Sequence, residues 1–278
     1  MTDLIVRRLM VDLETPLPRH WCAGDAFRTA WFNALSMSFP VGEQFFIDSV
    51  RAGVQQLPDG ERQRFEAEAR AFVGQEATHR RLHGLFNEHL ADQGLINHWA
   101  PRALRRMQRL EGVDVRAWVG LTAATEHFTA ILAEYLLGRP DVLRGTEPRL
   151  TALWLWHSCE ESEHRSTAFD LYRALGANEK WRLRLFRTAT VYFLLDALRQ
   201  TVNNLWHDGS FWRLATWTSG WRFLFARDGV LRGLVPAWRR YLRADFHPSQ
   251  QDDAPARAWL REHAAIWQPV GQPAAQPA

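Results

Sequence analysis

The chain of 278 residues contains only two cysteines, Cys22 and Cys159, which lie far apart in the sequence. Two isolated thiols do not make the disulfide framework of a small secreted protein, so we expect a reducing, cytoplasmic compartment. The first residues, from Met1 to Arg8, lack the apolar stretch of a secretory signal, and we expect no signal peptide. No apolar run reaches the ~18 residues that a membrane-spanning helix needs. These absences predict a soluble protein.

Concentrated basic charge is absent as well. The chain has 34 lysines and arginines against 31 aspartates and glutamates, and the arginines are spread along it. Because no nucleic-acid-binding motif appears either, we expect no nucleic-acid partner. Tryptophan, in contrast, is abundant: 14 residues, several of them between Trp206 and Trp238. This richness predicts either a helical core or homodimer interface, or a peripheral membrane contact in which arginine and tryptophan alternate.

The periodicity of the apolar residues predicts an all-α protein, and no strand pattern competes with it. Helices are predicted at about residues 26–38 (a short one), 40–57, 61–92, 97–110 (a linking helix), 115–137, 150–175 and 179–206, and two or three shorter ones reach 245. We expect an irregular N-terminal arm over 1–24 and a single helical domain over 25–245. Its bundle core covers about 40–176 and its extra helices 178–245. The C-terminal segment over 246–278 is expected to be disordered from about residue 268.

One predicted helix carries several residues of the types that bind metals. His157, Glu161 and His164 follow one another at spacings of four and three. On a helix these spacings place the three side chains on one face, with Cβ atoms about 6 Å apart. Glu160 and Glu163 are expected to point elsewhere and to be solvated.

The motif Glu-x-x-His occurs twice, as Glu76–His79 and as Glu161–His164. Two such short matches are weak evidence by themselves. Glu43 and Glu126, however, each lie on the helix that precedes one of the motifs. A carboxylate helix followed by a Glu-x-x-His helix, twice over, is the ligand pattern of ferritin-like four-helix bundles that hold two metal ions.

The charges of this constellation also predict a metal centre. Four carboxylates that converge in one core are costly unless they are neutralised. Two divalent ions would bring four positive charges against the four negative ones. Oxygen-rich ligation with imidazoles favours iron, or else manganese, over zinc.

The order of these motifs, together with Phe39-Pro40-Val41-Gly42-Glu43 and Asp245-Phe246-His247-Pro248, resembles a bacterial family of ferritin-like proteins described as predicted metal-dependent hydrolases. The similarity covers most of residues 5–250. The spacing from His157 to His164 is similar to that of the di-iron p-aminobenzoate N-oxygenases, in which the additional histidine is a third imidazole ligand. This resemblance implies seven metal ligands: Glu43, Glu76, His79, Glu126, His157, Glu161 and His164. As an alternative, His157 would hydrogen-bond to a neighbouring ligand.

Other candidates are given structural interpretations. His83 is expected on the helix surface, with a place beside a ligand as the alternative. His127 should lie outside the site, and His247 should fix a loop. Asp196 is expected to hold a ligand histidine or to pair with an arginine, and Cys159 to serve packing.

The leading functional hypothesis is a di-iron oxygenase or oxidase. Glu43 and Glu126 would act as shifting carboxylates, and a hydrophobic small molecule would bind in an aromatic pocket together with O₂. That pocket is expected near Phe39, Phe46, Phe72, Phe128 and Trp154. The alternatives are a dinuclear metal-dependent hydrolase, an iron-handling protein and a metal-free helical interaction protein.

Overall fold

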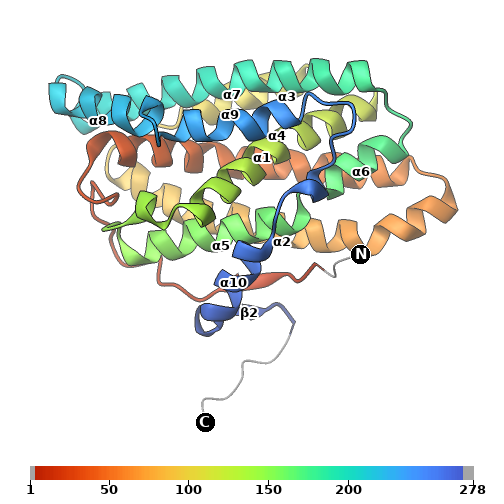
Figure 1. Ribbon diagram of the computed structural model, residues 1–278, viewed down its shortest axis with the longest axis horizontal. Coiled ribbons are helices and arrows are strands. Elements are labelled where there is room, and N and C mark those ends of the chain that lie inside the picture. The colour runs from red at the N-terminus through yellow and green to blue at the C-terminus, as the bar shows by residue number, and fades with distance from the viewer. Residues whose placement is uncertain (1–3, 272–278) are drawn as a thin grey trace, which may run out of the picture.

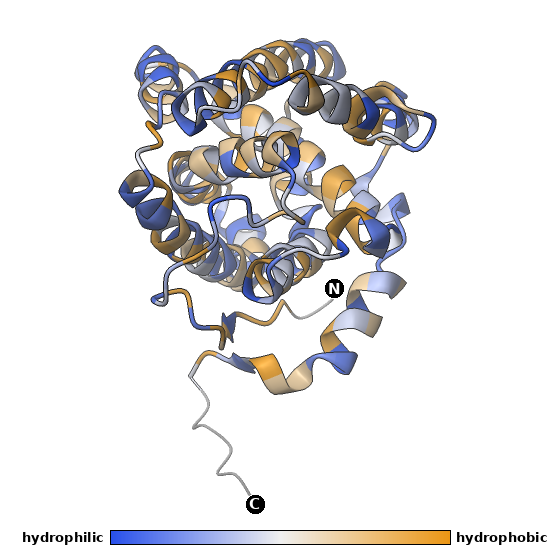
Figure 2. Cartoon of the chain, turned by 90° about the vertical axis from the view of Figure 1, so that its left-hand side faces the viewer, coloured by the Kyte–Doolittle hydropathy of each residue, from blue (hydrophilic) through white to orange (hydrophobic). Residues whose placement is uncertain are grey.

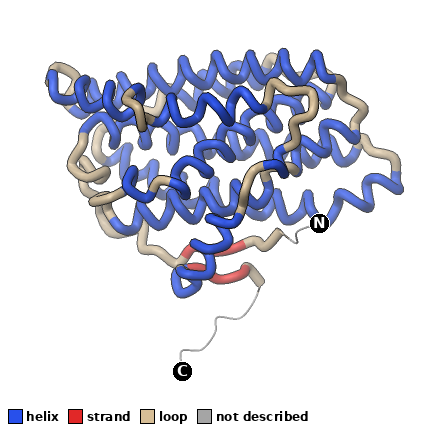
Figure 3. Tube along the Cα trace, viewed as in Figure 1, coloured by secondary structure: helices blue, strands red, loops and turns tan. Residues whose placement is uncertain are grey.

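The computed structural model describes residues 4–271 and confirms the predicted all-α fold (Figures 1 and 3). The long helices are α1 (Ala26–Gln55), α2 (Asp59–Asp92), α4 (Val115–Gly138), α5 (Pro148–His164) and α7 (Glu179–Asp208). The shorter ones are α3 (Trp99–Gln108), α6 (Thr167–Ala174), α8 (Leu214–Phe225), α9 (Val230–Arg240) and α10 (Ala254–Glu262). Three 3₁₀ turns, η1 (Pro140–Leu143), η2 (Pro248–Gln250) and η3 (Ala264–Ile266), complete the helical elements of these residues.

Four helices form the bundle that positions the site. α1 packs along α2, α4 packs along α5, and α1 contacts α4 between the two pairs. Local capping sets where several helices begin: the side chains of Asp25, Asp114 and Asn178 accept hydrogen bonds from backbone N–H groups in the first turns of α1, α4 and α7. α7 ends at Gly209, which adopts the left-handed conformation (φ 76°) that glycine tolerates best.

A layer formed by α7, α8 and α9 covers one side of this bundle. α7 packs on α1 and α4, α8 on α1, and α9 on α4. In Figure 1 this layer runs along the upper edge of the molecule, whereas α2, α5 and α10 lie toward the lower edge; the end-on view of Figure 2 shows the same layering. No helix in residues 4–271 combines the length and the apolar composition that crossing a membrane requires.

Two helix boundaries differ from the prediction. α1 is one helix of 30 residues that contains Pro40, instead of two helices separated near that residue. Proline removes one helical hydrogen bond, but packing of both halves against neighbouring helices offsets this loss. The helix predicted over 150–175 is broken into α5 and α6. At the break, the Arg165 side chain donates to the carbonyl oxygens of Pro248 and Gln251, a tertiary contact that local sequence does not reveal.

The chain ends contain a strand pair, contrary to the expectation of no strands. β1 (Arg7–Leu9) pairs antiparallel with β2 (Trp267–Pro269), so the arm over 1–24 is not irregular throughout. Gln268 and Pro269 are ordered in β2, within the segment expected to be disordered; its remainder from residue 272 lies outside the described residues. Strands of three residues carry too short an alternation to be recognised, and their pairing depends on a contact between opposite chain ends.

Candidate metal centre

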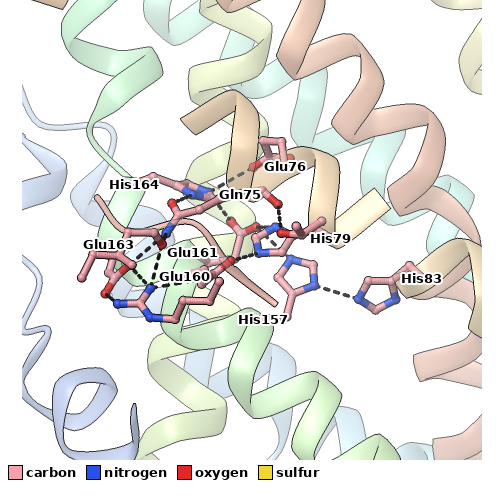
Figure 4. Close-up of polar contacts among 12 residues, drawn as sticks. Gln75, Glu76, His79, His83, His157, Glu160, Glu161, Glu163 and His164 are labelled. Atoms are coloured by element: carbon pink, nitrogen blue, oxygen red, sulfur yellow. Dashed lines mark hydrogen bonds and ion pairs between the residues drawn. The ribbon is translucent and has the colours of Figure 1, made fainter. Parts of the chain in front are cut away.

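The seven predicted ligands converge inside the bundle. Figure 4 shows the five of them that come from α2 and α5. Of the seven, α1 contributes one, α4 one, α2 two and α5 three. Every one of the seven is buried, with at most 3% of its surface exposed. The set is Glu43, Glu76, His79, Glu126, His157, Glu161 and His164.

Their ligand atoms form three overlapping groups, in each of which all atoms lie within 4.8 Å of one another. The groups are Glu43–His79–His157, Glu76–His79–Glu161 and Glu76–Glu126–His164. Because Glu76 and His79 each belong to two groups, neighbouring positions share ligands. Sharing of this kind is how carboxylate bundles hold two ions close together.

Most of the inward-facing atoms lack a hydrogen-bond partner in the described structure. These atoms are both carboxylate oxygens of Glu43, Glu76 and Glu126, together with Glu161 Oε2, His79 Nδ1 and His164 Nε2. Buried polar atoms are rarely left unpaired, and here nine of them surround one small volume. His164 Nε2 lies 3.1 Å from Glu76 Oε1 and 3.3 Å from Glu126 Oε2. The donor atoms therefore fit divalent cations placed among them.

The outer nitrogens of two histidines are held by residues behind the site. His79 Nε2 lies 3.0 Å from Glu160 Oε2, and His164 Nδ1 lies 2.9 Å from Gln75 Oε1. A carboxylate or amide oxygen accepts, so each of these ring nitrogens donates its proton outward. In the neutral ring the inner nitrogen, His79 Nδ1 or His164 Nε2, then offers a lone pair to the centre.

His157 is oriented by a chain of hydrogen bonds that starts at Asn87. The Asn87 amide nitrogen donates to the Ser36 carbonyl oxygen, so Asn87 Oδ1 accepts from the Ser36 hydroxyl. Ser36 Oγ, 2.9 Å from His83 Nδ1, then accepts from that ring, and His83 Nε2 accepts from His157 Nδ1 over 2.7 Å. This order leaves a lone pair on His157 Nε2, which faces Glu161 Oε1 at 2.8 Å. Two lone pairs at this distance repel each other unless a cation or proton lies beside them.

These hydrogen bonds correct the expectation for His83. His83 is fully buried and contacts His157; it does not lie on the helix surface. The aromatic ring of Phe39 packs against both imidazoles, with ring centroids 4.6 Å from His83 and 4.9 Å from His157. The position of His83 one turn after His79 is the only sequence signal for this role, and surface histidines share such spacings.

Glu160 and Glu163 also differ from the prediction that they are solvated. Glu160 is fully buried and lies within 3.3 Å of the Arg7 guanidinium, which also binds both oxygens of Glu163 at 2.7 and 2.8 Å. Gln75 Nε2 donates to Glu163 over 2.9 Å. Arg7 and Gln75 are not among the predicted site residues, because Arg7 comes from β1, far away in the sequence, and Gln75 has no metal-ligating side chain.

The electrostatics of the site follow from burial and mutual repulsion. Burial, reinforced by the neighbouring carboxylates, raises the pKa of Glu43 and Glu76 well above the ordinary value and that of Glu126 to about 7. Burial also acts to raise the pKa of Glu161, but the nearby imidazoles of His164 and His157 outweigh it, and the net shift is downward. Cations among these groups would replace the protons that the raised pKa values imply.

The metal-free protein is expected to lose stability as pH rises above about 6.5, the ordinary pKa of histidine. Burial lowers the pKa of His79 and His83, so both rings are neutral there in the folded and unfolded chains. Glu43, Glu76 and Glu126 have raised pKa values and keep protons that the unfolded chain has released, so their deprotonation destabilises the fold. Urea unfolding between about pH 6.5 and 8.5 should show this decline with chelator present and a flatter profile with bound metal.

The remaining candidates lie outside the centre. Asp196 pairs with Arg102, at 2.7 Å, and with Arg106, so it holds no ligand histidine. His127 Nε2 contacts a backbone carbonyl oxygen instead of the site. His247 bonds to Asp170, from α6, at 2.7 Å and thereby ties the loop after α9 to the bundle. Cys159 is buried in the core.

Comparison with known proteins agrees with the geometry of the site. Residues 5–252 match the model of a family described as predicted metal-dependent hydrolase. The chain belongs to this family. The match covers all seven converging side chains and confirms the family resemblance of the sequence motifs. No curated protein and no solved structure matches the chain.

A cavity of about 290 Å³ borders the His/Glu cluster of this family member. It lies among α1, α3, α4 and α7, with Glu43 in its lining, and it reaches the surface at Arg109 and Tyr192. Phe39 and Phe46 line it, as predicted. Most of the other lining residues are apolar or threonines, including Phe45, Met107, Leu110, Leu121, Thr125 and Phe193.

The other predicted pocket residues lie elsewhere. Phe128 lines a second cavity of about 260 Å³ between α1, α4, α7 and α9. Phe72 and Trp154 line neither cavity: Phe72 packs edge-on against His164, and Trp154 packs against Phe39. The aromatic residues therefore divide between supporting the imidazoles and lining two separate cavities.

Proposed function

We propose that the chain is a di-iron metalloenzyme that activates O₂ to oxidise a hydrophobic small molecule. The observation that carries this proposal is the set of nine unpaired, buried donor atoms beside an apolar cavity. The four negative charges of the carboxylates balance the four positive charges of two divalent ions, and the three imidazoles complete the set of donors. Such oxygen-rich sets suit iron or manganese. When bound, such ions would supply the electrons that O₂ activation requires.

The protein residues have separate tasks in this proposal. Glu43 lines the cavity and also belongs to a ligand group, so its carboxylate stands between the substrate space and the metal centre. Neither oxygen of Glu126 has a hydrogen-bond partner, so this carboxylate would be able to shift beside the metal ions that it helps to hold. Glu160, His83 and Gln75 hold the three imidazoles in place. The apolar walls around Phe39 and Phe46 exclude water and select an apolar substrate.

The test is metal analysis of the purified protein after anaerobic loading with ferrous iron, followed by exposure to O₂. We expect about two irons per chain, as in other carboxylate bundles, and a change in the visible spectrum when O₂ is added. A chain that binds no metal would rule out every dinuclear function. Loading of a single ion would contradict the shared ligand groups.

The second candidate function is metal-dependent hydrolysis, which the description of the family favours. In that case the centre would activate water, and the substrate would be an ester, amide or phosphate. Bound zinc or manganese, no response to O₂ and turnover of a chromogenic ester would establish this candidate and refute the oxygenase. Turnover that requires O₂ and iron would do the reverse.

Filling the cavity beside Glu43 should block the substrate without removing the metal. A Cβ on Gly42 would make only ordinary contact with Phe46, at 3.8 Å. Because Gly42 lines the cavity, we expect the side chain of Gly42→Leu to extend into it. We expect metal content to be unchanged, helix stability to rise by up to about 1 kcal/mol, and binding of a fluorescent apolar probe to fall about tenfold or more. Gly84→Leu on α2, where the added side chain meets open space, is the matched control. Equal probe binding by the two variants would show that the cavity is not the substrate site.

A further inference from the structure

Exposed apolar side chains gather on the layer formed by α7, α8 and α9. Among residues 4–271, eighteen large hydrophobic side chains are exposed, and twelve of them lie between Trp181 and Val235. The twelve are Trp181, Val191, Tyr192, Leu194, Leu195, Leu198, Trp206, Trp212, Leu214, Trp221, Phe225 and Val235. The layer lies on the outside of the bundle, along the upper edge in Figure 1. An exposed apolar surface of this extent is typical of an interaction site.

The second half of α7 has several polar side chains on its buried side, and the middle of the helix has apolar side chains on its outer side. Its buried side carries Asp196, Gln200 and Asn204, whose side chains bond to groups of the neighbouring segments. Its outer side carries Val191, Leu194, Leu195 and Leu198, at helical spacing and between 42% and 56% exposed. A helix that faced only water would place these residues the other way round. The outer side of α7 is therefore built for an apolar environment.

The charge of this layer indicates which kind of partner would bind to it. From Glu179 to Arg243 the chain has twelve lysines and arginines but four aspartates and glutamates, a net charge of +8 in a chain whose total is +3. Arg184, Arg187 and Arg199 are exposed on α7 and form no ion pair within the described residues. Two copies that faced each other through this layer would bring like charges together. An anionic lipid surface would attract it instead.

The positions of the tryptophans agree with such a surface. Trp181 lies near the start of α7 and Trp206 near its end, with the aliphatic residues between them, while Trp212 and Trp221, 80% and 67% exposed, extend the pattern into α8. Tryptophan prefers the boundary between lipid headgroups and acyl chains, and arginine prefers the headgroups. Since no described helix can cross a membrane, the contact would be peripheral.

We propose that the outer face of α7, α8 and α9 docks on a membrane surface that contains anionic lipid. α7 residues also line both cavities: Tyr192 lines the one beside Glu43, Leu194 the second, and Phe193 both. When the protein is docked, apolar ligands could pass from the lipid past α7 into these cavities. This last consequence, a lipid-soluble substrate, rests on the proposed function, whereas the docking itself does not.

Sedimentation with phosphatidylcholine vesicles, with and without phosphatidylglycerol, tests the docking. We expect the protein to bind the anionic vesicles, to bind pure phosphatidylcholine much more weakly, and to be released as salt screens the charges. Leu198→Glu should weaken binding about tenfold or more, because it puts a carboxylate in place of an exposed leucine that docking would bury in the lipid. Arg184→Glu reverses one charge and should weaken binding about fivefold for each unit of charge changed.

Matched controls lie on other faces. Met10→Glu replaces a side chain that is 50% exposed, against 51% for Leu198, and Arg64→Glu reverses an exposed charge on α2. Both should bind like the wild type, and circular dichroism should show all four variants folded. Absence of binding to anionic vesicles, or equal binding by Leu198→Glu and Met10→Glu, would overturn the proposal. So would a dimer in sedimentation velocity that Leu198→Glu dissociates while vesicles remain unbound.

The metal-site variant Glu76→Gln separates the two proposals. It should still bind vesicles, because Glu76 is fully buried on α2, a helix that does not belong to the layer formed by α7, α8 and α9. Vesicle binding by a protein that takes up no metal would refute the proposed function alone. Metal uptake and O₂ response in a protein that ignores vesicles would refute the docking alone.

Discussion

Replacing Glu76 by glutamine is expected to abolish metal binding and, at the same time, to stabilise the metal-free protein. Glu76 belongs to two of the three ligand groups, so its loss affects both metal positions. Metal content should fall from about two ions per chain to below one. Without metal, burial and the neighbouring carboxylates hold the pKa of Glu76 well above its ordinary value, so the carboxyl destabilises the fold at pH 7. An uncharged amide of the same shape removes most of that cost.

Two measurements check this prediction: metal content after loading, and the free energy of unfolding in the presence of chelator. Glu88→Gln on the same helix is the control, since Glu88 is exposed and should change neither quantity. A metal-free Glu76→Gln protein that is less stable than the wild type would contradict the electrostatic account. Full metal loading of the variant would contradict the sharing of ligands.

Replacing Arg7 by alanine is expected to destabilise the protein by about 3–5 kcal/mol, because it leaves partners of a buried ion pair without their counter-charge. Arg7 is 4% exposed and binds Glu160, which is fully buried, together with Glu163. Burial raises the pKa of Glu160 well above its ordinary value, and Arg7 is the main group that opposes this shift. Without Arg7, Glu160 would retain a proton and hold His79 less well, so metal affinity should fall about tenfold.

Arg8→Ala provides the control, because Arg8 is exposed in the same strand and should change stability by less than about 0.5 kcal/mol. Arg7→Lys keeps the charge and should recover part of both effects. Urea unfolding and metal titration measure them. If Arg7→Ala weakened metal binding no more than Arg8→Ala did, the link from the N-terminal strand to His79 would be wrong.

The seven converging residues could be predicted from the sequence because helical periodicity turns spacing into position. His157, Glu161 and His164 share a helix face whatever the rest of the fold does. To predict that Glu43 and Glu126 join them, we also had to assume that consecutive long helices pack as neighbours. In this chain the assumption holds, since α1 packs on α2 and α4 on α5. Local geometry and short connections were therefore sufficient to predict that these seven side chains converge.

The residues that orient these side chains could not be predicted in the same way. Arg7 reaches Glu160 from a strand whose partner is at the other end of the chain. His83 reaches His157 from a different helix, and Ser36 reaches His83 from a third. Each contact depends on how helices rotate and slide against one another, which spacing within one helix does not specify.

The same limit applies to α7. Its mixture of polar and apolar residues predicts a helix, but only packing on α1 and α4 decides that Gln200 and Asn204 face inward and Leu195 and Leu198 outward. Residue types and their spacing are sufficient for the helices and the seven converging side chains, because both arise from interactions within a few turns. The apolar outer side of α7, the cavities and the Arg7–Glu160 pair arise from contacts between segments far apart in the chain, and they exist only once the bundle has formed.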